Sequence, residues 1–366
     1  MKIKVNKAVA NSKPYKLVTQ KAWLEEEKSK VLKLDWNEST IAPSPKVIDS
    51  LKETIRADLI NWYPNIQNSI LVNKIANYCN VSEDNIQYFN GSDSIHESIF
   101  KTFSNDSDIF TIIGPTYDHP RSIAECFGLS LDFFYLDKNF EFDLKSFKEY
   151  IKNINPTLVY ICSPNNPVGN SYSNNILSEI FSEFPSILFI IDEAYQEFRS
   201  DKSCAELVKE FDNIIVTRTF SKAFGLASLR IGYCISSKSN IELMNKYRNP
   251  KSINLFAQVA AIAALDDINY TKKYINQVNE SKKYFIDSIN QNLSQFIKPM
   301  HSDGNFILFK INDSIQPNDL MNFFEQRKIY IRNYSHIEKL ENHLRVTIGT
   351  KDQTEKIIAT FKDYFL

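Results

Sequence analysis

A single lysine, Lys222, stands between two short apolar runs that are typical of strands. Two hydroxyls, Thr219 and Ser221, precede it closely, and the guanidinium of Arg230 follows eight residues later. An amine can form a Schiff base with a carbonyl group, whereas hydroxyls and a guanidinium can bind a phosphate. A lysine among small residues is a weak signal alone, because most lysines are solvated surface charges. The spacing nevertheless favours a carbonyl cofactor that carries a phosphate.

A carboxylate upstream strengthens this interpretation. The segment Ile-Ile-Asp-Glu-Ala-Tyr is an apolar run of the buried type that leads into Asp192. Such a carboxylate can stabilise a protonated pyridine nitrogen and so make the ring an electron sink. Asp192 could instead cap the end of a strand. Together with Lys222, it indicates pyridoxal 5'-phosphate as the cofactor.

Two more turn segments follow apolar, strand-like runs. Gly114-Pro-Thr-Tyr117 comes after one run, and Ser163-Pro-Asn-Asn-Pro-Val-Gly169 comes after the next. Strands alternate with helical stretches from about residue 86 to 235, which predicts a mostly parallel sheet with crossover helices. Ligands of open α/β sheets collect at the carboxyl ends of strands, where these turns lie.

These motifs together resemble the fold-type-I pyridoxal-phosphate enzymes and, within them, the histidinol-phosphate aminotransferase family of class I and II. The resemblance extends from about Pro14 to Thr350 and rests on Asn-Asn-Pro-x-Gly, Asp-Glu-Ala-Tyr, Ser-Lys and Leu-Arg-Val-Thr-Ile-Gly-Thr in combination. It implies an α/β fold, with a large domain built on a mostly parallel sheet between helices and a smaller α+β domain. It also implies a homodimer with shared active sites.

The family pattern implies roles for the cofactor residues. Lys222 would form the Schiff base and later act as general base and acid, and Asp192 would pair with the ring nitrogen. Tyr195 would contact the ring hydroxyl and Asn166 the ring oxygen. Tyr117 would stack on the ring, and Tyr63 would reach the phosphate bound by the neighbouring subunit. Trp62-Tyr63 could equally be a local packing pair. The remaining implied cofactor contacts are Gly91, Ser92, Asp93, Thr219, Ser221 and Arg230.

The segment Gly91-Ser-Asp93 supports a phosphate site independently of the family. It precedes a helix-like run at 94–103, so its amides are expected at a helix N-terminus, which favours an anion. The same three residues are also common as a plain helix cap.

Two arginines carry the prediction of the substrate. Arg345 matches the family arginine that grips the substrate carboxylate as a bidentate fork. Arg332 matches the one that meets a distal phosphate, or the side-chain carboxylate of glutamate. Tyr15 and Asn37 occupy further substrate positions of the family. Both arginines could instead form structural ion pairs.

Three departures from the family pattern concern the second substrate. Ser94 replaces an acidic residue, Asp118-His119-Pro120 replaces the usual glycine and aromatic, and Asn37-Glu38 continues as Ser-Thr. The cofactor motifs are intact, but recognition of an imidazole ring is not supported.

Composition excludes several other classes. The 366 residues are 43% hydrophobic, with 43 Lys and Arg against 44 Asp and Glu. This balance provides no basic field for nucleic acid or an anionic membrane surface. No apolar stretch approaches the about 20 residues of a transmembrane helix, and the N-terminus lacks the apolar core of a signal peptide. The five scattered cysteines favour reduced thiols rather than disulfides or a metal site, and therefore the cytoplasm.

The sequence thus predicts an aminotransferase that moves an amino group between glutamate and a small phosphorylated oxo or amino compound. Two alternatives stay open: a decarboxylase of a phosphorylated amino acid, such as threonine phosphate or serine phosphate, and an inactive regulatory homologue. The expected division is an N-terminal arm at 1–30, part of the small domain at 31–55, the large cofactor domain at 56–250, and an interdomain helix with the C-terminal small domain at 251–366.

Overall fold

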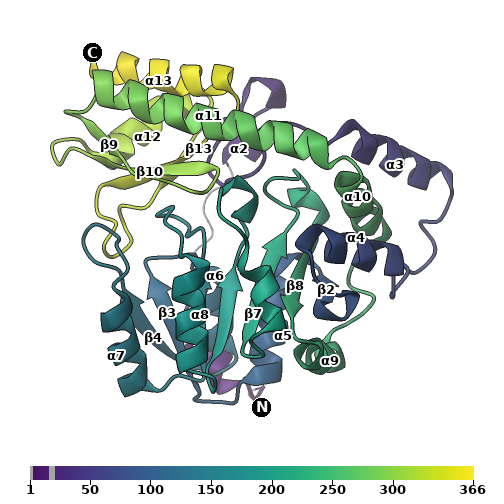
Figure 1. Cartoon of the computed structure of the whole chain (residues 1–366). Coiled ribbons are helices and arrows are strands. Elements are labelled where there is room, and N and C mark those ends of the chain that lie inside the picture. The colour runs from purple at the N-terminus through teal and green to yellow at the C-terminus, as the bar shows by residue number, and fades with distance from the viewer. Residues whose placement is uncertain (1–2, 16–20) are drawn as a thin grey trace.

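The computed structural model describes residues 3–15 and 21–366. Its largest element is a seven-stranded sheet with the strand order β2-β8-β7-β6-β5-β3-β4 (Figure 1). Only β8 is antiparallel to its neighbours, so the sheet is mostly parallel, as predicted. The strands are β2 (Ile86–Phe89), β3 (Ile109–Gly114), β4 (Ser130–Tyr135), β5 (Leu158–Cys162), β6 (Leu188–Asp192), β7 (Ile214–Thr219) and β8 (Gly232–Ser236).

The central strands are apolar along their whole length because helices cover both faces of the sheet. In β5, Leu158, Tyr160 and Cys162 belong to one core, whereas Val159 and Ile161 belong to the core on the opposite face. The first face is covered by α5 (Gly91–Phe103), α6 (His119–Cys126) and α9 (Lys238–Tyr247), and the second by α7 (Leu144–Ile154) and α8 (Asn174–Glu183).

A smaller antiparallel sheet has the order β12-β13-β10-β9 and lies above the large sheet in Figure 1. The long helix α11 crosses the top of the molecule and runs beside α13, with which it covers this sheet. The elements are β9 (Ile297–Pro299), β10 (Phe306–Ile311), β12 (Arg332–Asn333), β13 (His343–Thr347), α11 (Ile268–Asn292), α12 (Pro317–Gln326) and α13 (Lys351–Phe365).

Residues 329–332 look like one continuous strand in the sequence, but the chain changes sheets within them. Residues Ile329–Tyr330 form β11, which pairs in parallel with β1 (Leu32–Lys33), whereas Arg332 already belongs to β12. The side chain of Ile331, between the two strands, is buried. This switch places Arg332 directly opposite Arg345 in the pairing of β12 with β13.

Helix α5 also begins earlier than predicted, at Gly91 rather than Ser94. The Gly-Ser-Asp segment therefore forms the first turn of the helix instead of preceding it. The side chain of the N-cap residue, Asn90, accepts no hydrogen bond from the amides of this turn. The first amides of α5 are consequently available to an anion.

The other helices complete the structure. Helices α3 and α4 pack against α10 at one side of the molecule (Figure 1). The remaining helices are α1 (Lys7–Asn11), α2 (Lys21–Leu24), α3 (Pro45–Arg56), α4 (Ser69–Cys79) and α10 (Leu255–Leu265). Short 3₁₀ turns lie at Lys28–Lys30, Glu83–Asn85, Gln196–Phe198, Cys204–Lys209 and Ala227–Leu229. In the described part of the chain, no helix has the length and apolar character needed to cross a membrane. The domain boundaries at 30, 55 and 250 stay predictions.

Candidate active site

Turns at the carboxyl ends of four strands meet at one edge of the large sheet. Strands β3, β5, β6 and β7 are parallel neighbours, so their carboxyl ends point to the same side. β3 ends at Gly114, β5 leads into the 163–169 segment, and β6 and β7 end at Asp192 and Thr219. The fold therefore brings together motifs that lie far apart in the sequence.

Lys222 lies in the turn after β7, with its amine directed inward. The Nζ atom donates a hydrogen bond to the carbonyl oxygen of Trp36 at 2.8 Å and lies 5.7 Å from the ring centre of Tyr195. Burial lowers the pKa of Lys222 to about 8; Glu38 opposes this effect and Arg345 reinforces it. A larger fraction of the amine is therefore neutral near pH 7 than for an ordinary lysine, as a nucleophile requires.

The carboxylate of Asp192 is buried at the end of β6. Its Oδ2 atom accepts a hydrogen bond from the Tyr160 hydroxyl at 2.7 Å, and its Oδ1 atom accepts one from the Ala194 amide at 3.1 Å. These two hydrogen bonds fix the orientation of the carboxylate, which lies one strand away from the lysine turn.

Tyr195 is held by Asn37, which comes from the N-terminal part of the chain. The Asn37 side-chain amide donates to the Tyr195 hydroxyl oxygen at 3.0 Å. Asn37 has φ 56°, a left-handed conformation that asparagine tolerates well. The backbone N–H of Asn37 donates to Thr347 Oγ1 at 3.1 Å. The position of the Tyr195 hydroxyl thus depends on three separate segments.

A second group of predicted residues gathers around the first turn of α5. Arg230 Nη2 lies 3.3 Å from Asp93 Oδ2, and Nη1 donates to Ser221 Oγ at 3.4 Å. A Cβ atom at Gly91, which has φ +79°, would lie 2.6 Å from Arg230 Nη2, so glycine keeps this space open. The guanidinium, the free amides and this space fit a phosphate. The group consists of Gly91, Ser92, Asp93, Thr219, Ser221 and Arg230.

Asp93 also binds two aromatic side chains of the site. His119 Nδ1 lies 3.2 Å from Asp93 Oδ1, and the Tyr117 hydroxyl donates to the same oxygen at 3.3 Å. Burial alone would raise the pKa of Asp93, but the hydrogen bond and charge of His119, together with Arg230, lower it to about 2. The rings of Tyr117 and His119 stack, and Tyr15 packs edge-on against both.

Arg345 and Arg332 are cross-strand neighbours in the small sheet. Arg345 is buried; its Nη1 donates to Asn166 Oδ1 at 2.5 Å and to the Tyr334 hydroxyl at 2.8 Å, and its Nη2 donates to the carbonyl oxygen of Asp35. The buried Nε atom has no hydrogen-bond partner among the described residues. Like charges directly opposite each other destabilise a sheet, so bound anions would relieve this repulsion.

One predicted cofactor residue, Tyr63, lies apart from the others. It sits between α3 and α4, its side chain is 79% exposed, and Lys251 Nζ lies over its ring at 4.6 Å. The structure therefore groups the other predicted residues within one chain and leaves Tyr63 on the surface.

Several residues that shape the site were not predicted. Tyr160 lies in the middle of an apolar strand, where a tyrosine looks like core. His96 looks like a core residue of α5, and Tyr334 follows the strand that carries Arg332. One signal was available for His119, which stands in a segment that departs from the family pattern. The contacts of the others depend on elements that only the fold brings together.

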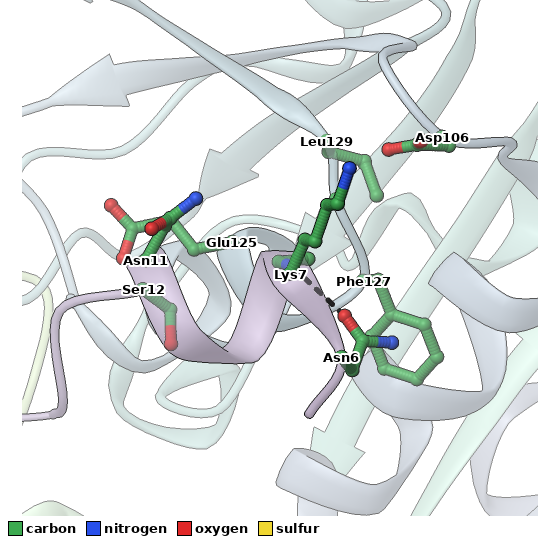
Figure 2. A pocket seen from close by; sticks show the side chains of 10 residues that line it. Asn6, Lys7, Asn11, Ser12, Asp106, Glu125, Phe127 and Leu129 are labelled. Carbon is green, nitrogen blue, oxygen red and sulfur yellow. Dashed lines mark hydrogen bonds between the residues drawn. The ribbon is translucent and has the colours of Figure 1, made fainter. Parts of the chain in front are cut away.

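A shallow hollow of about 560 Å³ lies at the opposite end of the large sheet and is not part of this site. Figure 2 shows it between α1 and the connection from α6 to β4, with Lys7, Asp106 and Phe127 at its walls. Asp106 and Leu129 precede β3 and β4, so the hollow borders the amino ends of these strands.

In the part of the chain that the structure describes, no cluster of His, Cys, Asp or Glu could hold a metal ion.

Comparison with known proteins agrees with this geometry. The family model "Aminotransferase class I and II" matches residues 29–361. A dihydroxyacetone phosphate transaminase of Campylobacter jejuni is 40% identical over 365 residues, which cover 99% of this chain and 97% of that protein. A histidinol-phosphate aminotransferase of Thermoanaerobacter is 30% identical over 91% of this chain and 93% of that protein.

A solved structure supports the fold. The histidinol-phosphate aminotransferase of Sinorhizobium meliloti was determined in complex with pyridoxal 5'-phosphate. It has a TM-score of 0.86 with this chain, at 21% identity and 98% coverage of both chains. The chain is therefore a pyridoxal-phosphate-dependent aminotransferase of class I and II with the fold-type-I architecture. Within that class it belongs to the histidinol-phosphate aminotransferase family.

Proposed function

We propose that the enzyme moves an amino group between glutamate and a small phosphorylated oxo or amino compound. The observation that carries this proposal is the pairing of Arg332 with Arg345 across β12 and β13. Glutamate has two carboxylates and can occupy both guanidinium groups. A phosphorylated ketone has one anionic group and needs only one of them, which we assign to Arg332.

For the second substrate we propose dihydroxyacetone phosphate. The relative from Campylobacter jejuni carries that activity in its name and matches nearly the whole chain. The departures at Ser94 and at Asp118-His119-Pro120 argue in the same direction, because they alter the surroundings of the second substrate and leave the cofactor motifs intact. A three-carbon ketone requires no imidazole recognition.

The roles of the residues follow from their positions. When bound, pyridoxal phosphate supplies an electron sink for the bond broken at the substrate carbon. Lys222 would hold the cofactor covalently and, once released, move the proton at the substrate carbon. Asp192 would face the ring nitrogen, and Tyr195 and Asn166 would contact the ring hydroxyl. The first turn of α5, Ser221 and Arg230 would bind the cofactor phosphate.

The proposal is tested by supplying the purified enzyme with glutamate and a series of acceptors. We expect 2-oxoglutarate to form with dihydroxyacetone phosphate, and at least about tenfold more slowly with dihydroxyacetone, which lacks the charge-assisted contact. Imidazole acetol phosphate serves as the matched phosphorylated competitor. Equal rates with and without the phosphate would contradict the assignment. Release of carbon dioxide from threonine phosphate, without 2-oxoglutarate formation, would instead support the decarboxylase.

We further propose that the enzyme is a cytoplasmic homodimer with shared active sites. Exposed apolar side chains cluster around Tyr63, from α3 through the following loop to α4. A monomer rarely exposes so many adjacent apolar groups, so a second copy of the chain is the proposed cover. The exposed apolar side chains of this cluster are Ile48, Ile55, Ile60, Trp62, Tyr63, Ile66 and Ile70.

Subunit mixing tests the shared site. Tyr63→Phe is expected to weaken activity and Lys222→Ala to abolish it. In a hybrid dimer one site carries both changes and the other carries neither, so random exchange should restore roughly a quarter of the wild-type sites. Activity is measured after mixing, and exchange is verified with differently tagged subunits. No recovery despite exchange would indicate that each site is built from one subunit.

A further inference from the structure

His96 is a buried histidine whose place in the core is unusual. It lies on α5, its side chain has 0% exposure, and neither ring nitrogen has a hydrogen-bond partner among the described residues. A buried polar group without a partner is destabilising, and an aliphatic side chain would avoid this cost. The surrounding core, which includes Ile95, Ile99 and Phe100, would accept one.

The nitrogen of His96 faces the carboxylate proposed for the cofactor ring. Nε2 lies 3.9 Å from Asp192 Oδ2, which is the same oxygen that accepts the hydrogen bond from Tyr160. The rings of His96 and Tyr160 also meet edge to face, with their centres 5.7 Å apart. One small movement of the ring would therefore give this oxygen a second donor.

Burial favours the neutral form of the His96 ring. Burial lowers the pKa of His96, and the nearby groups Asp192 and Asp93 oppose this effect while His119 adds to it. A neutral imidazole still has one N–H group, so it can donate to Asp192 without bringing a second buried charge. The opposite ring nitrogen would then be the one without a proton.

We propose that His96 is a positioning residue for Asp192: after a small movement of the ring, its Nε2–H group joins the Tyr160 hydroxyl in holding Oδ2, and the two donors keep the carboxylate aimed at the cofactor's ring nitrogen. This inference rests on the proposed role of Asp192. Two donors on Oδ2 fix the direction of the carboxylate, and a carboxylate that faces the ring nitrogen favours the protonated ring.

The test is made on the holoenzyme reconstituted with pyridoxal phosphate labelled with ¹⁵N at the ring nitrogen. The ¹⁵N chemical shift reports directly whether that nitrogen is protonated. We expect a protonated ring in the wild type and a shift toward the neutral value in His96→Leu. His96→Gln, which keeps a side-chain donor, should restore most of the shift. The rate of proton removal from glutamate should fall on the order of tenfold to a hundredfold in His96→Leu.

Two comparisons keep the outcomes distinct. His96→Leu should unfold at a temperature close to or above that of the wild type, since it replaces a buried polar ring with an apolar side chain in an apolar core. A wild-type ring shift in a folded His96→Leu enzyme, together with a neutral shift in Asp192→Asn, would overturn the inference and leave the role of Asp192 standing. An unchanged shift in Asp192→Asn would overturn the assignment of Asp192 and the inference with it.

Discussion

The Lys222→Ala variant is expected to fold normally and to lose turnover. The side chain is partly exposed, so its removal takes little volume from the core, whereas its amine is the only group in the turn after β7 that can bind the cofactor covalently. Loss of a positioned acid and base alone typically costs about 10²- to 10⁴-fold, and loss of the covalent attachment adds to it. Turnover with glutamate and the visible absorbance of the bound cofactor are the measurements.

Lys238→Ala is the matched control for this experiment. Lys238 is an exposed lysine at the start of α9, in an ion pair with Asp84. Its replacement should leave both absorbance and turnover at wild-type values, because exposed ion pairs contribute little. Full activity in Lys222→Ala would remove the basis for the proposed site.

Replacing the two arginines is expected to separate the two half-reactions. Charge-assisted hydrogen bonds are worth about 1.5–3 kcal/mol each, so each loss should lower kcat/KM on the order of tenfold to a few hundredfold. Arg332→Ala should weaken the reactions of both glutamate and the phosphorylated ketone, because both place an anion there. Arg345→Ala should weaken mainly the glutamate reaction and spare an acceptor without an α-carboxylate. The two half-reactions are followed separately by the absorbance change of the cofactor.

Two more variants show whether the effect comes from the guanidinium geometry. Arg345→Lys keeps the charge but not the planar fork, so it should remain well below the wild type with glutamate. Arg327→Ala removes an exposed guanidinium at the end of α12 and should have no effect. If the Arg332→Ala enzyme converts phosphorylated and unphosphorylated acceptors equally fast, at wild-type rates, then Arg332 does not bind the substrate phosphate.

Sequence reasoning was sufficient for the parts of the site that reside in local motifs. Apolar strands followed by turn residues placed Lys222, Asp192 and the 163–169 segment at one sheet edge, because parallel strands share the direction of their carboxyl ends. The split of residues 329–333 between two sheets was not predictable, since Ile329 and Arg332 look like one continuous strand. The role of Tyr334 depends on side-chain contact with Arg345, which local periodicity does not encode.

Lys222 and Arg345 both donate hydrogen bonds to the same short stretch of backbone, the neighbouring carbonyl groups of Asp35 and Trp36. Asp35 accepts from Arg345, and Trp36 accepts from Lys222. If Lys222 holds the cofactor as proposed, the Trp36 carbonyl would lose its donor, and a carboxylate bound at Arg345 would compete with the Asp35 carbonyl. Displacement of one contact would then loosen the peptide that makes the other, so we expect the two occupancies to be thermodynamically coupled. Linkage makes this coupling reciprocal. The cofactor should change the affinity for a dicarboxylate by a certain factor, and the dicarboxylate should change the affinity for the cofactor by the same factor.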